Sequence, residues 1–348
     1  MQQLKPIWKQ LSSLWSPPPD LKVDEWSDRY RKLSSESSAE AGQWRTDRVP
    51  FQREVMQVIN DPSVEEIIFI KSAQVGATEI LLNTIGYYID QEPSTILCIQ
   101  PSLSMAKTFS KDRLAPMLRD TPKLRGKIAD PRSRDSENTI DHKKFAGGSL
   151  TLTGANSASG LRSRPIRILL FDEVDSYPAD VQGEGDVISL GRKRTTTFWN
   201  RKIILTSTPT IKGLSRIERA YEESDKRVYK VPCPECNQKQ ELKWQQITWL
   251  ENKPETASLS CKHCGAIIPE SKKQWMLLNG EWAAQAESKK VGFHISELYS
   301  PFRTWVELVQ DFLEAKKSPE LLQTFINTTL GETWEEQGEE IEAEGLMS

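Results

Sequence analysis

Short apolar runs that alternate with helical segments constrain the fold of this chain more than any other feature. Four of these runs have strand length, at residues 66–70, 95–99, 166–171 and 202–206. A strand with one exposed face alternates polar and apolar residues, whereas a strand covered on both faces is nearly continuously apolar. Strands of the second kind, separated by helical segments, predict a mainly parallel α/β sheet with helices on both faces.

Other segments complete this expected layout. A further strand is expected at 149–152, and helices are expected at 51–59, 78–89, 103–118, 304–317 and 319–328. Composition divides the 348 residues into five expected parts: an N-terminal docking segment and linker at 1–24, an α/β core at 25–227, a β-rich metal module at 228–290, closing helices at 291–334 and an acidic tail at 335–348. The N-terminal segment has amphipathic spacing before a proline run, which suits either a partner-docking helix or a surface helix packed on its own domain.

Bulk composition excludes several classes of protein. The net charge is −3, so no overall basic field points to nucleic acid, and any contact with DNA has to come from local patches. The chain has no run of 18 apolar residues, and its first residues lack the apolar core of a signal peptide. We therefore expect an intracellular protein that makes no contact with a membrane.

Residues 70–78, Ile-Lys-Ser-Ala-Gln-Val-Gly-Ala-Thr, resemble a phosphate-binding loop whose lysine is displaced. The usual pattern is G-x-x-x-x-G-K-[ST] between a strand and a helix. Gly76 and Thr78 occupy the positions of the second glycine and the hydroxyl, Ala77 replaces the usual lysine, and Lys71 stands at the first glycine. If Lys71 folds back over the phosphates, the site is that of an unusual ATPase; otherwise the segment is an ordinary strand-to-helix turn.

Several residues of this loop are expected to contact ATP and its metal. Backbone N–H groups at the start of a helix form a cradle for anions. The expected nucleotide contacts in the loop are Lys71, Ser72, Ala73, Gln74, Val75, Gly76, Ala77 and Thr78. Of these, Thr78 is also expected to supply its hydroxyl to Mg²⁺.

Two further apolar strands end in polar residues that suit the same site. Asp172 and Glu173 follow one strand, where Asp172 would hold Mg²⁺ and Glu173 would act as the general base toward the attacking water. Thr206-Ser207-Thr208-Pro209-Thr210 ends the next strand, and hydroxyls there, Thr208 among them, could sense the terminal phosphate. Each motif alone also fits a helix cap or a turn, but three in this order favour one phosphate site.

Four cysteines form two C-x-x-C pairs. The expected zinc ligands are Cys233, Cys236, Cys261 and Cys264. In an intracellular chain this pattern favours a tetrahedral zinc site over disulfides. Four thiolates leave no open position, so the predicted role of Zn²⁺ is structural. His263, between two ligands, is expected to be exposed rather than coordinating.

Local basic clusters are the candidates for contact with a phosphate backbone. They are Lys107, Lys111 and Arg113, then Lys143 and Lys144, then 192–194, and then Arg201 and Lys202. Such clusters could hold DNA without reading its sequence, although each could equally be a solvated surface.

The order of the motifs resembles the large terminase subunit of phage-lambda-type DNA-packaging motors. The segments that carry the likeness are 44–53, 71–76, 170–173, 207–210, 233–236, 299–305 and 327–335. The resemblance implies the fold of a RecA-like P-loop ATPase with a small zinc-ribbon-like β module. It also supports Lys71 as the phosphate-binding lysine, and it places Phe51 and Gln52 near adenine, Gln52 being the stronger candidate.

The same resemblance implies an activity and partners. The activity would be ATP hydrolysis that drives double-stranded DNA into a procapsid in the host cytoplasm. The implied partners are the small terminase subunit, bound by the N-terminal segment, the portal protein of the procapsid, and further copies of the chain in a ring. The alternatives are another nucleic-acid translocase, or a zinc-ribbon nucleic-acid-binding protein whose ATP site has decayed.

Two departures from the family pattern carry their own expectations. Family members often have arginine inside the phosphate loop, where this chain has Gln74, so Arg162 or Arg164 becomes the candidate catalytic arginine. Packaging terminases also carry a nuclease domain after the ATPase domain. Because this chain ends soon after the closing helices, we expect no nuclease domain and no nuclease activity.

Overall fold

The computed structural model describes residues 19–38, 40–128, 138–157, 160, 164–251 and 253–335. Its α-helices are α2 (Val23–Tyr30), α3 (Gln52–Val58), α4 (Ala77–Asp90), α5 (Leu103–Thr108), α6 (Ala115–Asp120), α8 (Val187–Lys193), α9 (Arg216–Glu222), α10 (Lys273–Leu278), α11 (Trp305–Ala315) and α12 (Pro319–Phe325). Two π-helical segments are η2 (Phe109–Leu114) and η7 (Ile326–Leu330). Short 3₁₀ turns are η1 (Thr46–Arg48), η3 (Val174–Ser176), η4 (Trp244–Gln246), η5 (Glu270–Lys272) and η6 (Glu297–Tyr299).

The strands follow the expected apolar runs and add several more. They are β1 (Lys32–Leu33), β2 (Gly42–Gln43), β3 (Glu66–Lys71), β4 (Thr95–Gln100), β5 (His142–Phe145), β6 (Gly148–Gly154), β7 (Ile168–Asp172), β8 (Lys202–Ser207), β9 (Arg227–Pro232), β10 (Lys239–Glu241), β11 (Ile247–Leu250), β12 (Lys253–Ser260), β13 (Ile267–Ile268), β14 (Glu281–Ala283) and β15 (Val291–Ile295). The four apolar runs of strand length, at 66–70, 95–99, 166–171 and 202–206, therefore correspond to β3, β4, β7 and β8.

The largest sheet in the described part of the chain has ten strands. Their order is β10-β9-β15-β3-β8-β7-β4-β6-β5, with β14 also paired to β9. Pairing is parallel from β9 through β6, while β5, β10 and β14 are antiparallel to their neighbours. The predicted mainly parallel sheet is confirmed. Because these strands run the same way, the carboxyl ends of β3, β8, β7 and β4 meet at one edge.

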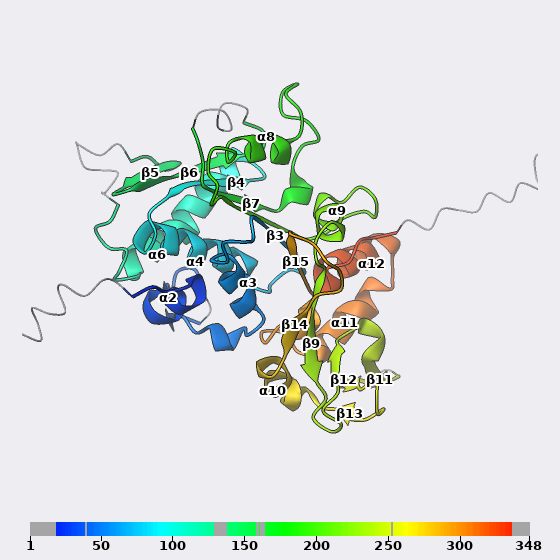
Figure 1. The fold of residues 1–348 in the computed structure, drawn as a ribbon. Coiled ribbons are helices and arrows are strands. Elements are labelled where there is room, and N and C mark those ends of the chain that lie inside the picture. The colour runs from blue at the N-terminus through cyan, green and yellow to red at the C-terminus, as the bar shows by residue number, and fades with distance from the viewer. Residues whose placement is uncertain are drawn as a thin grey trace, which may run out of the picture.

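Helices cover both faces of this sheet. Successive side chains of a strand point to opposite faces. In β3, Ile67 and Phe69 pack in the buried cluster that includes α3 and α4, whereas Ile68 and Ile70 pack in the cluster that includes α8 and α9. Figure 1 shows α3 and α4 on one side of the sheet and α8 on the other. Burial on both faces explains why these strands are continuously apolar.

Close packing fixes α4 directly behind the sheet. Its buried side chains include Ile80, Leu81 and Ile85, which face the core. Gly86 allows the ring of Trp26 to pack against the helix backbone, because a Cβ at position 86 would lie 2.4 Å from that ring. This rigid placement matters because α4 starts at the end of the candidate phosphate loop.

Two segments differ from the expected secondary structure. The helix expected at 103–118 consists of α5, the π-helical η2 and α6 in succession. The closing part expected to be helical at 291–334 begins with β15, which inserts between β3 and β9 in the main sheet. Its sequence, Val-Gly-Phe-His-Ile, is a short apolar run that offers a strand to the parallel sheet. The two expected closing helices are present as α11 and α12.

The expected metal module is joined to the main sheet by its outer strands. β9, β10 and β14 extend the ten-stranded sheet, whereas β11, β12 and β13 form a separate sheet of three strands. Trp244 connects this part to the closing helices through ring contacts at 5.0 Å with both Phe312 and Phe325. None of the described helices is long and apolar enough to cross a membrane. Most of the N-terminal docking segment and of the acidic tail lies outside the described residues.

Candidate functional site

The candidate phosphate loop joins the end of β3 to the start of α4. Lys71 is the last residue of β3, and Gly76 precedes the first helical residue, Ala77. Gly76 has φ of 77°, a left-handed conformation that glycine adopts without a steric penalty. Gln74 is also left-handed, with φ of 55°, and its side chain is exposed. The sequence expectation of a loop between a strand and a helix is therefore met.

The loop backbone is held by the C-terminal part of the chain. The Ser72 amide donates to the Ile295 carbonyl at 2.9 Å, and the Ala73 amide donates to the Thr328 carbonyl at 2.7 Å. These two N–H groups are thus engaged within the protein, whereas we expected them to face the anion. In this conformation the cradle is left to the amides from Gln74 to Ala77, which surround the start of α4.

Lys71 lies between the two other motifs of the site. Its ammonium group forms an ion pair with the Glu173 carboxylate and donates to the Thr208 hydroxyl at 3.2 Å. The side chain of Lys71 is 9% exposed and that of Glu173 is 30% exposed. Lysine at the start of the loop therefore reaches the ends of both β7 and β8. The predicted meeting of Lys71, Glu173 and Thr208 is present.

Glu173 occupies a constrained position after β7. Its backbone is left-handed, with φ of 53°, which is uncommon for a residue with a side chain. The second carboxylate oxygen accepts from the Thr208 amide at 3.1 Å and from the Ser207 hydroxyl at 3.4 Å. Contacts with β3 and with the end of β8 thus hold both oxygens, and strained residues of this kind cluster at functional sites.

Asp172 is the buried member of the acidic pair. Its oxygens accept from the Gln100 side chain at 3.0 Å and from the Thr206 hydroxyl at 2.9 Å. Burial, followed by repulsion from Glu173, raises the pKa of Asp172 above its usual value. Gln100 was not among the predicted site residues. It ends the apolar run of β4 just as Lys71 and Asp172 end theirs, and that position was the available signal.

These groups line one cleft of about 680 Å³. Its described lining is Lys71, Ser72, Ala73, Gln74, Val75, Gly76, Ala77, Thr78, Gln100, Met105, Thr108, Phe109, Asp112, Arg113, Asp172, Glu173 and Thr208. Nearly all of the predicted nucleotide-binding residues therefore share a cavity. The Asp172 and Glu173 carboxylates and the Thr78 hydroxyl are hard oxygen donors of the kind that Mg²⁺ prefers. Burial and the neighbouring Glu173 raise the pKa of Asp172, and a divalent cation would offset this unfavourable negative charge, so the residues fit Mg²⁺.

Gln52 lies behind the phosphate loop. It is fully buried and donates from its side-chain amide to the Val75 carbonyl at 2.7 Å. The same amide nitrogen would lie 2.5 Å from a Cβ at Gly76, so a larger residue there would press on Gln52. Gln52 therefore supports the shape of the loop, and its contact with adenine stays a prediction. Phe51 is also fully buried, edge-on to Tyr229 at 6.1 Å.

Of the two candidate catalytic arginines, Arg164 alone is among the described residues. Arg162 lies outside them. The Arg164 guanidinium is exposed and lies 3.1 Å from the ring of His142. Arg164 does not contribute to the described lining of the cleft. Arg113, which sequence reasoning assigned only to a basic cluster, does line it.

Several of the predicted DNA-binding cations are engaged within the protein. Arg192 pairs with Glu66 at 2.6 Å, and Arg201 pairs with Glu65 at 2.6 Å. Lys143 is buried, and its ammonium group donates to the Thr139 carbonyl at 3.1 Å. Spacing in the sequence could not show the partners of Arg192 and Arg201, because Glu66 and Glu65 lie more than a hundred residues away along the chain.

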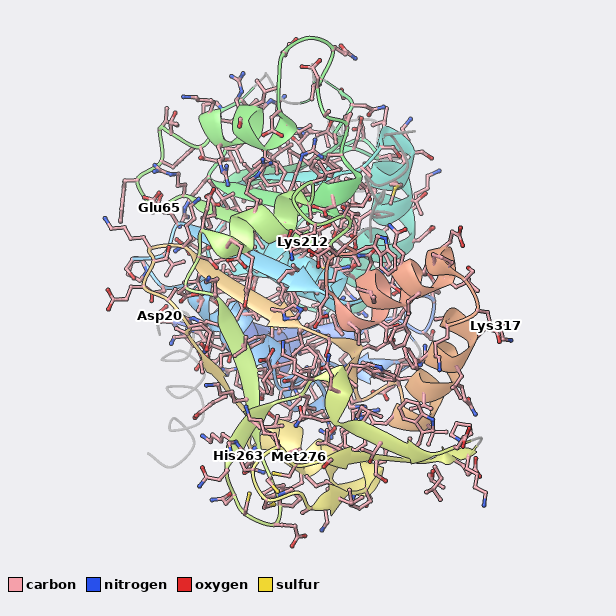
Figure 2. All side chains as sticks on the ribbon, turned by 90° about the vertical axis from the view of Figure 1, so that its right-hand side faces the viewer. Asp20, Glu65, Lys212, His263, Met276 and Lys317 are labelled. Atoms are coloured by element: carbon pink, nitrogen blue, oxygen red, sulfur yellow. The ribbon has the colours of Figure 1, made fainter. Side chains whose placement is uncertain are left out.

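The four predicted metal ligands meet in one cluster. The ligand atoms of Cys233, Cys236, Cys261 and Cys264 all lie within 4.8 Å of one another. The sulfur atoms are 3.9 Å apart between Cys233 and Cys264, and 3.8 Å apart between Cys236 and Cys261. Tetrahedral zinc with Zn–S bonds of about 2.3 Å separates its sulfurs by about 3.8 Å, so the geometry fits this metal. His263 is exposed, as expected, and Figure 2 shows it at the lower end of the molecule, away from the central sheet.

The parallel sheet, the loop before α4 and the carboxylates at the end of β7 define a P-loop ATPase fold. A family model described as the phage terminase large subunit gpA, ATPase domain, matches residues 38–282. The chain therefore belongs to this family. A second model, the endonuclease domain of the same subunit, matches residues 290–348, so the expectation of a chain without nuclease activity is not confirmed.

Curated relatives agree with this assignment. The chain is 36% identical over 365 residues to the terminase large subunit of Enterobacteria phage P21, covering 97% of this chain and 56% of that protein. It is 31% identical over 363 residues to the terminase large subunit of Escherichia phage lambda, covering 96% and 56% respectively. The chain thus spans about half the length of these relatives. Among solved structures it is similar to the large terminase ATPase domain of Thermus phage P74-26, with 13% identity and a TM-score of 0.46 over 79% of this chain and 91% of that one.

Proposed function

We propose that this chain hydrolyses ATP in the cleft at the end of β3 and uses the energy to move double-stranded DNA into a procapsid. The observation that carries the proposal is the convergence of Lys71, Glu173 and Thr208, which come from three separate strands. A decayed nucleotide site has no need to keep such a buried, mutually paired set. The relatives named as terminase large subunits support the packaging role.

The contacts indicate a separate role for each of these residues in ATP hydrolysis. Lys71 would exchange the Glu173 carboxylate for phosphate oxygens when ATP enters. Glu173 would then accept a proton from water as the water oxygen bonds to the terminal phosphorus and the bond to the leaving ADP oxygen breaks. Thr208, which is hydrogen-bonded to both Lys71 and Glu173, would sense the loss of that phosphate. Mg²⁺, held by Asp172 and Thr78, would supply positive charge to the phosphate oxygens.

ATP turnover of matched variants tests this proposal. Lys71→Ala should abolish ATP binding, and Glu173→Gln should retain binding while lowering kcat by about 100-fold or more. Lys212→Ala is the control, because Lys212 is exposed and its one ion pair in the described part of the chain is with Glu335, at 2.9 Å. Normal turnover by Lys71→Ala would refute the displaced-lysine assignment. Wild-type protein that binds no nucleotide would instead favour a zinc-ribbon protein with a decayed ATP site.

The cysteine cluster is proposed to hold one structural Zn²⁺. All four ligands come from two turns, one after β9 and the other between β12 and β13, so the metal would fasten the small sheet to the large one. Metal analysis of the purified protein should return about one zinc per chain. Protein without zinc that keeps its fold would refute this assignment.

The remaining proposals concern partners and cutting. We propose the small terminase subunit, the portal protein and a ring of further copies as partners in the host cytoplasm. The absence of nuclease activity also stays a proposal, supported by the packing of β15 inside the ATPase sheet. Incubation of supercoiled plasmid with the protein and Mg²⁺ or Mn²⁺ tests it, since nicking would show that the matched residues 290–348 can cut DNA.

A further inference from the structure

The charges that line the ATP cleft are unbalanced for a polyphosphate. Among its described lining residues, three are acidic, Asp112, Asp172 and Glu173, and two are cationic, Lys71 and Arg113. Lys71 is already paired with Glu173, and two of the loop amides are bonded to carbonyl groups. A bound triphosphate therefore needs further positive charge from the protein, and Arg113 is the side chain in the described lining that can supply it.

Sheet order relates the position of Arg113 to that of Lys71. Lys71 ends β3, and the acidic pair follows β7 two positions along the sheet. Arg113 lies on η2, in the connection that follows β4, the neighbour of β7 on the side away from β3. Both cations therefore line the cleft that holds the acidic pair, Lys71 at the end of β3 and Arg113 in the connection after β4. The phosphate that lies beside Glu173, where hydrolysis occurs, would be within that cleft.

The partners of Arg113 allow it to turn toward a phosphate. Its guanidinium donates to Glu79 at 2.6 Å and to the Ser37 carbonyl at 3.0 Å. The other oxygen of Glu79 is held at 2.9 Å by Arg31, whose side chain is only 3% exposed. Two guanidinium groups therefore share one carboxylate, which leaves one positive charge in excess. Arg31 would keep Glu79 neutralised if Arg113 moved away.

Other features of Arg113 agree with this exchange. Its Nε atom is buried and has no hydrogen-bond partner among the described residues, so the guanidinium has unused donor capacity. Its side chain is 35% exposed, whereas Arg31 is enclosed. Arginine is suited to phosphate because its planar group presents several N–H donors at once. The π-helical turn that carries it is a kind of irregularity often found at functional sites.

We propose that Arg113 contacts the terminal phosphate of ATP bound to the same chain, exchanging Glu79 for phosphate oxygens. This inference rests on the proposed ATPase function. It assigns to Arg113 the charge that Gln74 does not provide in the loop. It also predicts discrimination, because a contact with the terminal phosphate strengthens the binding of ATP and leaves that of ADP unchanged.

Equilibrium binding of a non-hydrolysable ATP analogue and of ADP tests the inference. Arg113→Gln should weaken analogue binding by about tenfold to a hundredfold while ADP binding stays within about twofold, as expected for a charged hydrogen bond. Arg31→Gln is the matched control, since Arg31 binds the same Glu79 and does not line the cleft. It should leave the ratio of the two affinities unchanged. Arg113→Lys keeps the charge and should recover part of the ATP preference, and it serves as the second variant if Arg113→Gln does not fold.

Three results would overturn the assignment. An unchanged affinity ratio in Arg113→Gln would show that Arg113 does not touch the phosphate. Equal changes in Arg113→Gln and Arg31→Gln would show that both residues act only by holding Glu79. The third is an ATP preference in Arg113→Lys as low as in Arg113→Gln, which would show that a positive charge at this position makes no contact with the terminal phosphate. In each case wild-type protein still binds ATP, so failure of the inference is distinct from failure of the proposed function.

Discussion

Gly331 gives the sharpest test of how the C-terminal segment shapes the phosphate loop. It follows η7 with φ of 65°, and its carbonyl lies 3.0 Å from the Nε2 atom of the half-buried His294. A Cβ at this position would be 2.9 Å from the Ser72 nitrogen, 3.1 Å from the Lys71 carbonyl carbon and 3.1 Å from the Ile295 oxygen. These neighbours are backbone atoms, so none can rotate aside, and Gly331→Ala has to displace the loop.

The expected loss of stability has two parts. A non-glycine residue in the left-handed region costs about 1–2 kcal/mol. Contact of the new methyl group with fixed backbone adds about 1–3 kcal/mol, as overpacking does elsewhere. Gly126→Ala is the matched control, because Gly126 has φ of 75° and no atom within 4 Å of an added Cβ. It should show the first part alone.

Urea unfolding and steady-state ATP turnover measure both consequences. Gly331→Ala should lose about 1–3 kcal/mol more than Gly126→Ala in the free energy of unfolding. It should also lower kcat/KM by about tenfold or more, since Lys71 and Ser72 shift from their positions. Gly126→Ala should keep wild-type turnover. Equal stability and equal turnover in the two variants would refute the view that Gly331 presses directly on the phosphate loop.

Three further predictions follow from other contacts. Asp172→Asn should abolish Mg²⁺-dependent turnover, which an ATPase assay measures. It should also stabilise the nucleotide-free protein by about 1 kcal/mol, because it removes a buried carboxylate whose pKa is raised by burial and by Glu173. Thermal unfolding measures this second effect, and a lower stability of the variant would contradict the reasoning. Burial lowers the pKa of His294 below 6.5, so the stability contributed by its neutral form is present above that pH and is lost as the pH falls toward the lowered pKa. Between pH 7.5 and 5, His294→Gln should therefore lose less free energy of unfolding than wild type. Identical pH profiles of the two proteins would argue against this. Cys264→Ser should lose its bound zinc and have a lower melting temperature, whereas His263→Ala should keep about one zinc per chain. Metal analysis of both proteins tests this prediction. Loss of zinc in His263→Ala would point to a different set of ligands.

The strands and the site motifs at their ends were predictable because burial on two faces produces a continuous apolar run in the local sequence. A strand in a parallel sheet has to be apolar along its whole length, and its polar end marks the functional edge. That rule located Lys71, Asp172 and Ser207 at the ends of β3, β7 and β8. The C-x-x-C pairs were equally predictable from local sequence, since a tight turn brings the two cysteines of each pair together and thiolates are preferred ligands of zinc.

The sequence missed the residues whose roles depend on distant partners. β15 was overlooked because a five-residue run resembles many turns until β3 and β9 are available to pair with it. The carbonyl groups of Ile295 and Thr328 hold the loop through backbone atoms, which leave no side-chain signature. Arg113 looked like one cation in a surface cluster until η2 was packed beside α4.

The sequence by itself determined the parallel α/β fold and the order of the motifs, and it named the candidate residues of the phosphate site. These follow from local polarity, from glycine at the loop and from the chemistry of Lys71, Asp172 and Glu173. Only the tertiary structure decided how those groups are paired. Strand order brings the ends of β3, β7 and β8 together, although Lys71 and Glu173 are 102 residues apart along the chain and Glu173 and Thr208 are 35 residues apart. The same packing commits two loop amides to the C-terminal segment and turns Arg113 toward the cleft, since both contacts join elements that are remote in sequence.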